Sequence, residues 1–164
     1  LKRAGEVRKT AERQSFNGTF FCDHAIRNEN GVLEIQDGHI SEACQYYAIL
    51  FGNINIASEK YKKLRNFVLA ASPENNNCGS KIFRVNAFIG FYLRMEALLK
   101  MKEYKILLND IEKFFGKMEE YSGTLWEYRD GKGSKDHGFA SYVLSVILDS
   151  LDAAGEKYQL MNGR

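Results

Sequence analysis

The sequence predicts a mainly α-helical protein with the architecture of an α/α toroid, made of antiparallel helical hairpins. Along the chain, helical segments with one apolar face alternate with segments that are apolar around nearly their whole circumference. A helix that is apolar on all sides must be covered on all sides, whereas a striped helix can face water. Two concentric layers of helices satisfy both requirements. The competing arrangement is a solenoid of helix pairs, but no pattern recurs at a period of about 34 to 45 residues.

The first half of the chain begins with a polar segment, residues 1–15, whose apolar residues recur at helical spacing and predict an exposed helix. Two short extended runs around residues 28–31 predict a small β-hairpin near residues 19–34. The next helix is expected to begin after Ser41, a suitable N-cap residue, and to end at Gly52. Its body is apolar nearly all round, which assigns it to the inner layer.

The remaining helices continue the alternation. Residues 58–70 and 103–119 each have one apolar face and belong to the predicted outer layer, whereas residues 82–101 and 139–151 belong to the inner layer. At 164 residues the chain has the length of about one domain. Three helix pairs do not close a ring, so the chain is expected to supply only part of a toroid.

Composition excludes several classes of function. The 164 residues include 23 Lys and Arg against 21 Asp and Glu, and the two signs are interspersed. Without a basic stripe, the sequence predicts no binding to nucleic acid. No apolar run reaches the roughly 20 uncharged residues that a membrane-spanning helix needs, so no membrane association is expected.

The cysteines and the first residue bear on the setting of the protein. Cys22, Cys44 and Cys78 are widely spaced and form no CxxC motif, which predicts reduced thiols rather than a disulfide framework. Reduced thiols suit the cytoplasm and are compatible with the periplasm, so the compartment stays open. Because Leu1 is not a methionine, we expect that it is not the natural start.

One loop carries the most distinctive residues. The segment GTLWEYRDGKGSKDHGFASYV, residues 123–143, contains the only tryptophan of the chain, Trp126, beside Glu127. Its glycines interrupt any helix, so the segment is expected to join an outer helix to an inner one, where the loops of a toroid approach the central cleft. His137 lies just before the inner helix, near the positive end of that helix's dipole.

The sequence predicts no cofactor and no metal ion. It contains no glycine-rich phosphate loop, no HExxH and no GxSxG motif. Cys22, Asp23 and His24 are residue types that bind metals, but adjacent residues in an extended run alternate sides, so at most two could converge. We therefore interpret this triplet as structural.

The GTLWE run followed by SKDHGFASYV resembles the C-terminal part of the catalytic domain of α-L-rhamnosidases, glycoside hydrolase family seventy-eight. In that family a Thr-aliphatic-Trp-Glu run precedes a Ser-x-Asn-His run that leads into a helix. GHISEACQYYAILFG is similar to the family's entry into another inner helix. The resemblance covers about residues 1–155 and implies that they are part of an (α/α)6 barrel domain, with residues 156–164 as a tail or linker. It also implies an inverting glycosidase that hydrolyses terminal α-L-rhamnosides without a cofactor.

The resemblance implies a role for each residue of the motif. Glu127 matches the general base, Trp126 an aromatic residue flanking the sugar, and His137 a histidine that contacts the sugar. A base needs an ionised carboxylate, an aromatic wall suits the apolar faces of a deoxy-sugar, and histidine can bond a hydroxyl in either direction. Glu42, at the start of its helix, is a further candidate to line the cleft and bind substrate.

Each candidate also has a structural interpretation. Glu127 is then a surface acid, Trp126 a packing residue, His137 a cap of the last helix, and Glu42 an acid favoured by the helix dipole. The chain also departs from the family, because Asp136 stands where asparagine is usual. No segment matches the Asp-rich run that carries the family's general acid.

The missing acid predicts that this chain is the C-terminal half of a catalytic domain and is inactive alone. Its expected partners are a rhamnose-containing glycoside and either the N-terminal half of the domain or a second copy, because inner helices would expose an apolar flank. Two other interpretations stay open. One is a catalytically inactive helical module that binds carbohydrate or a protein, and the other is a related toroidal glycosidase acting on another sugar.

Overall fold

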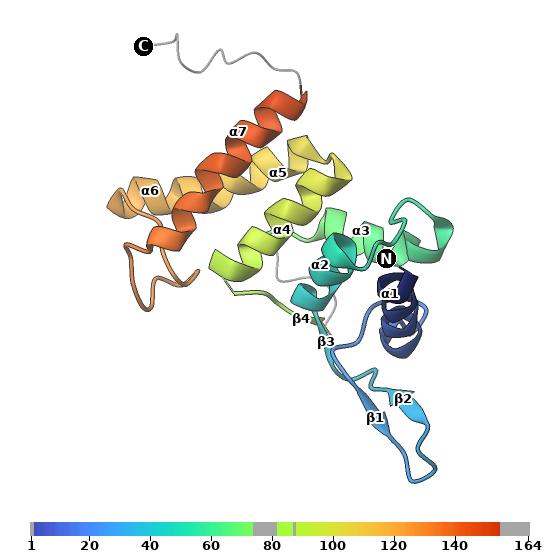
Figure 1. The fold of residues 1–164 in the computed structure, drawn as a ribbon. Helices are drawn as coiled ribbons and strands as arrows, with labels where there is room; N and C mark the ends of the chain where they lie inside the picture. The colour runs from blue at the N-terminus through green and yellow to red at the C-terminus, as the bar shows by residue number, and fades with distance from the viewer. Residues whose placement is uncertain (1, 74–81, 87, 155–164) are drawn as a thin grey trace. The chain divides into compact units, whose positions relative to one another are not determined.

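The computed structural model describes residues 2–73, 82–86 and 88–154, and it confirms that the protein is mainly helical. The chain divides into two compact units, Leu1–Val85 and Asn86–Arg164, which are described separately. Figure 1 shows their elements in order along the chain. None of the helices in the described ranges has the length and apolar character that crossing a membrane requires.

The first unit begins with α1 (Lys2–Ser15), which buries none of its side chains, as expected for the exposed helix that the sequence predicts. Strands β1 (Ala25–Arg27) and β2 (Leu33–Ile35) form an antiparallel hairpin in which Ala25 lies opposite Ile35. The predicted hairpin is therefore confirmed. It projects from the helices of its unit (Figure 1).

Helix α2 (Glu42–Phe51) starts where the sequence predicts. The Oγ of Ser41 accepts a hydrogen bond from the backbone N–H of Cys44 at 3.2 Å, which makes Ser41 the N-cap. The 3-10 turn η1 (Glu59–Tyr61) and α3 (Lys62–Ala70) together cover the next predicted helix. The largest fully buried apolar side chains of this unit lie on α2 and α3: Tyr46, Ile49, Leu64 and Val68.

Strand β4 (Ile82–Phe83) corrects the prediction of a helix over residues 82–101. It pairs in parallel with β3 (Ile40–Ser41), so that Ile40 lies opposite Ile82. Helix α4 (Phe88–Met101) therefore begins later than the sequence suggests. The strand pairing joins segments that are distant along the chain, and a local apolar pattern carries no signal for it.

The second unit is built from α4 and the elements that follow it, namely α5 (Tyr104–Ile111), the π-helical turn η2 (Glu112–Gly116), α6 (Lys117–Ser122), the 3-10 turn η3 (Gly138–Tyr142) and α7 (Val143–Ala154). Helix α4 packs against α5 and α7, and α5 packs against α7 (Figure 1). The helix predicted over residues 103–119 is present, with a π-helical turn inside it. The helix predicted over residues 139–151 begins as a 3-10 turn.

An aromatic cluster and an ion pair join α4 to the α5–η2 segment. The ring of Phe91 stacks on Phe114 with centroids 4.5 Å apart and meets Phe115 edge-on. Arg94 on α4 donates from Nε and Nη2 to Oδ2 of Asp110 on α5, at 2.9 and 2.7 Å. Both side chains are buried, so this pairing offsets the cost of removing their charges from water.

Candidate functional site

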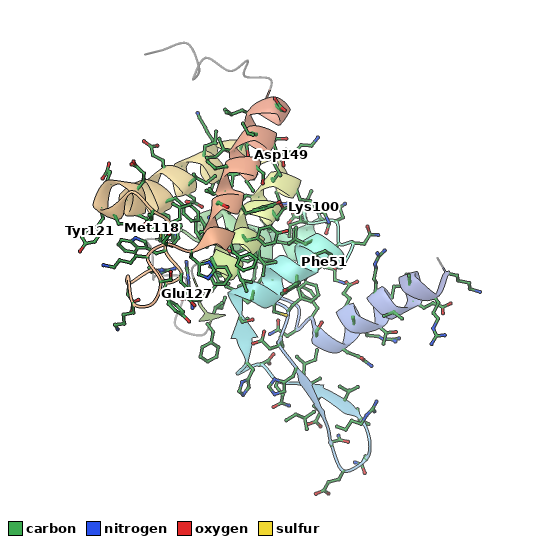
Figure 2. The ribbon with its side chains drawn as sticks, turned by 60° about the vertical axis from the view of Figure 1, so that its left-hand side comes forward. Phe51, Lys100, Met118, Tyr121, Glu127 and Asp149 are labelled. Carbon is green, nitrogen blue, oxygen red and sulfur yellow. The ribbon has the colours of Figure 1, made fainter. Side chains whose placement is uncertain are left out.

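The loop between α6 and η3 holds three of the predicted site residues: Trp126, Glu127 and His137. It begins at Gly123, whose φ of 68° is left-handed and whose backbone N–H donates to the carbonyl of Glu119 at 2.7 Å. This C-cap ends α6 and turns the chain away from the helix axis. Figure 2 shows Glu127 in the loop, with Met118 and Tyr121 on the neighbouring α6.

Backbone hydrogen bonds bring the two ends of this loop together. The N–H of Glu127 donates to the carbonyl of Ser134 at 2.9 Å, and the N–H of His137 donates to the carbonyl of Leu125 at 2.8 Å. These two backbone hydrogen bonds therefore connect the segment around Trp126 and Glu127 to the segment that ends at His137. The structure brings Glu127 and His137 into the same folded loop.

Glu127 is half-buried, and its Oε2 accepts a hydrogen bond from the backbone N–H of Ser134 at 3.3 Å. Glycine at position 133 permits this approach. Its φ is 97°, and a Cβ there would stand 2.6 Å from Cδ2 of Tyr128 and 3.0 Å from Oε2 of Glu127. The other oxygen, Oε1, accepts no hydrogen bond from the residues that the structure describes. A carboxylate anchored at one oxygen and open at the other can take a proton from a small polar ligand.

The ring of Trp126 is engaged by its own loop and by α6. Its Nε1 donates to Oγ of Ser122 at 2.8 Å, and its ring meets Tyr121 edge-on at 5.4 Å. The ammonium of Lys135 lies 5.4 Å from the ring centroid, and a Cβ at Gly131 would stand 3.2 Å from Cζ3. These contacts make Trp126 a packing residue of the loop, and its predicted contact with a sugar stays a prediction.

His137 is half-buried and stacks on Phe88 of α4, with ring centroids 4.2 Å apart. The ring of Phe139 also lies near His137, with centroids 5.7 Å apart, and it stacks on Phe88 at 6.2 Å. The Nδ1 atom is buried and has no hydrogen-bond partner within the described part of the chain. A buried polar atom without a partner is costly, so this nitrogen is a candidate to bind a ligand hydroxyl.

An apolar pocket adjoins the His137 ring in the second unit. Its volume is about 430 Å³, and its lining consists of Phe88, Ile89, Tyr92, Phe139 and Tyr142. The hydroxyl of Tyr142 donates to Oε1 of Glu96 at 2.6 Å, and this bond together with burial raises the pKa of Tyr142. The residues of this pocket were not among the candidates that the sequence predicts. The signal was present in the aromatic spacing, because residues four apart (Phe88 and Tyr92) or three apart (Phe139 and Tyr142) share a helix face.

Glu42 lies in the first unit, at the start of α2, and its side chain is fully buried. Its Oε1 accepts from the hydroxyl of Tyr46 at 2.5 Å. Its Oε2 accepts from the backbone N–H of Val85 at 3.0 Å and lies 3.0 Å from Nε of Arg84. Both oxygens are therefore committed to bonds within the unit, which supports the structural interpretation of this residue.

The described residues include no group of three or more His, Cys, Asp and Glu side chains placed to hold a metal ion. Cys22 is buried, and burial together with the charge of Asp37 raises its pKa to about 11. Burial and the charge of Asp23 raise the pKa of Cys44 to about 12. Both thiols stay protonated at neutral pH, and a protonated thiol is a poor metal ligand.

In comparisons with known proteins, no protein-family model, no curated protein and no solved structure matches the chain.

Proposed function

We propose that the chain is part of an inverting glycoside hydrolase of the α-L-rhamnosidase type and that Glu127 is its general base. One observation carries the proposal: a single loop, closed by the backbone bonds Glu127–Ser134 and His137–Leu125, holds the Glu127 carboxylate at one oxygen and also contains His137, whose Nδ1 lacks a partner among the described residues. A general base needs a carboxylate that is fixed in place but still accessible to a proton, as that of Glu127 is. A sugar hydroxyl needs a hydrogen-bond partner, which His137 Nδ1 can supply.

In this mechanism Glu127 removes a proton from a water molecule. The water oxygen attacks the anomeric carbon from the face opposite to the leaving group, and the bond to the leaving oxygen breaks as a general acid protonates it. The acid and base carboxyl groups stand about 6.5–9.5 Å apart in inverting enzymes, which leaves room for the water. We assign the acid to the other half of an (α/α)6 barrel, to which this chain contributes helical hairpins.

The same proposal accounts for the apolar surface of the second unit. Several large apolar side chains of α4, η3 and α7 are exposed, among them Ile89, Tyr92, Phe139, Leu144 and Leu148. Patches of this kind are covered in soluble proteins by another part of the chain or by a partner. The N-terminal half of the barrel is the proposed cover in the parent protein, and self-association is the expected outcome for the isolated chain, which light scattering at rising concentration measures.

A second candidate function is a catalytically inactive module on the same scaffold that binds carbohydrate or a protein. The aromatic pocket beside His137 favours it, because aromatic side chains cover the apolar faces of sugars and anchor protein partners. Asp136, at the position where the family usually has asparagine, also favours it. A related glycosidase acting on another sugar shares every feature of the first candidate.

The deciding experiment measures hydrolysis of an aryl α-L-rhamnoside by the longest product that the gene encodes. We expect Glu127→Gln to lower kcat by about 10²–10⁴-fold, since it removes the base. Glu120→Gln, an exposed acid on α6, is the matched control and is expected to keep full activity. NMR of the first-formed sugar is expected to show inversion at the anomeric carbon. In Glu127→Ala, azide is expected to restore turnover by occupying the place of the attacking water.

Other outcomes separate the candidates. An active parent that Glu127→Gln does not impair would overturn the assignment of the base. An inactive parent that still binds a rhamnoside, with binding kept in Glu127→Gln, supports the binding module. The 164-residue chain alone is expected to show no turnover. Turnover by this chain would place the general acid within its own residues.

A further inference from the structure

Two histidine side chains lie side by side next to the hairpin of the first unit. The imidazole rings of His24, just before β1, and His39, just before β3, have centroids 4.6 Å apart and an interplanar angle of 55°. Both side chains are exposed. The proposed glycosidase function leaves this pair unused. The two histidines are 15 residues apart in the sequence, so no local motif joins them.

The backbone holds the two histidines in this arrangement. The N–H of Asp23 donates to the carbonyl of His39 at 2.8 Å, and the N–H of Gln36 donates to the carbonyl of His24 at 3.3 Å. Asp23 Oδ1 also accepts from the N–H and the hydroxyl of Ser41, at 3.1 and 2.6 Å. These hydrogen bonds therefore fix the backbone at both histidines, while the exposed rings can still rotate about their side-chain torsions.

The separation of the rings fits two ligands of one metal ion. With metal–nitrogen bonds of about 2.0–2.1 Å, two imidazoles bound at neighbouring positions of one ion have centroids about 4.5–5 Å apart. Imidazole is a preferred ligand of Zn²⁺, Ni²⁺ and Cu²⁺. Because the backbone already holds the two side chains close together, both imidazoles can bind one ion as a chelate.

We propose that His24 and His39 form a binding site for a divalent transition-metal ion, which cross-links the two chain segments beside the β1–β2 hairpin. The two imidazoles supply the protein ligands, and water completes the coordination. A further carboxylate is not required: Oδ1 of Asp23 is committed to Ser41, and Oδ1 of Asp37 accepts from Asn17 at 2.8 Å.

The test is isothermal titration of the whole chain with Ni²⁺, repeated with Zn²⁺, at neutral pH and without reductant or chelator. We expect one equivalent to bind. His24→Gln and His39→Gln are each expected to weaken binding by about tenfold or more, because even outer-sphere partners of metal ligands contribute that much. His137→Gln removes the third histidine of the chain and is the matched control, with binding of both ions expected to be unchanged.

A second readout is thermal unfolding. An ion that binds the folded state raises the melting temperature of the protein. Ni²⁺ is therefore expected to raise Tm by several degrees in the wild type and in His137→Gln, but not in His24→Gln or His39→Gln. Because both rings are exposed, the variants are expected to fold, and circular dichroism checks this. Binding that survives in the His24→Gln, His39→Gln double variant, or that disappears when the cysteines are alkylated, would overturn the proposal.

Discussion

The two candidate acids, Glu42 in the first unit and Glu127 in the second, are held in opposite ways. Both oxygens of Glu42 have partners, and its side chain is fully buried beside Arg84. Glu127 is half-buried, and the backbone N–H of Ser134 holds its Oε2. The first arrangement commits the whole charge to stability. The second fixes the carboxylate at Oε2 and leaves Oε1 without a hydrogen-bond partner among the described residues, as the proposed role of general base requires.

The largest expected effect is on stability at Glu42. Glu42→Gln removes the charge that faces Arg84, and breaking a buried ion pair costs about 3–5 kcal/mol. The value is expected near the lower limit, because Arg84 keeps some exposure to water. Urea unfolding gives the loss of free energy, and hydrogen exchange in α2 locates it in the first unit.

Glu6→Gln is the control for this prediction, because Glu6 is exposed on α1 and its loss is expected to change stability by less than about 0.5 kcal/mol. If Glu42→Gln is as mild as Glu6→Gln, then Glu42 is not a structural acid, and its prediction as a substrate ligand regains support.

The next effect concerns the loop around Glu127. Gly133→Ala places a Cβ 2.6 Å from Tyr128 and forces a left-handed φ on a residue that rarely adopts it. Strain of this kind costs about 1–3 kcal/mol, so the loop is expected to open locally rather than the unit to unfold. Faster hydrogen exchange at the Glu127 N–H and a shift in the fluorescence of Trp126, the only tryptophan, measure the opening.

Gly138→Ala is the matched control, because its Cβ would meet no atom within 4 Å. If the parent protein is the proposed glycosidase, Gly133→Ala is also expected to lower its kcat, since it displaces the carboxylate that Ser134 holds. Unchanged exchange at Glu127 in Gly133→Ala would show that the loop does not depend on glycine at that position.

The elements that the sequence predicted correctly depend on neighbouring residues. The exposed α1, the hairpin and the Ser41 cap each follow from a local pattern of apolar, turn or capping residues. The predicted start of α4 was wrong because it depends on a distant segment: residues 82–83 form β4, which pairs with β3. The apolar pattern of residues 103–119 also predicted a regular α-helix and gave no sign of the π-helical turn inside it.

The candidate site divides along the same line. The sequence identified Glu127, Trp126 and His137 by resemblance, and it placed them in a loop because of the glycines around them. The hydrogen bonds between Glu127 and Ser134 are made across that loop, and the sequence contains no spacing pattern that predicts them. For Glu42 the helix dipole predicted an acid at that position, whereas its pairing with Arg84 required the fold.

The effect that is smallest near neutral pH is a pH dependence of stability, which arises at Cys44 near Glu42 and develops only above pH 9. Burial and the charge of Asp23 raise the pKa of Cys44, on the same helix, from its ordinary value of 9.0 to about 12. The unfolded chain loses this proton near pH 9 while the folded chain keeps it, so the stability that the thiol contributes is complete below pH 9 and declines up to about pH 12. The decline is at most about 1.4 kcal/mol per pH unit.

Cys44→Ser keeps a donor for the carbonyl of Cys22 but does not titrate, so its unfolding free energy between pH 9 and 11 is expected to fall less steeply than that of the wild type. Parallel slopes would mean that the start of α2 tolerates a new charge, and the contrast with the open loop around Glu127 would then rest on the ion pair of Glu42 alone.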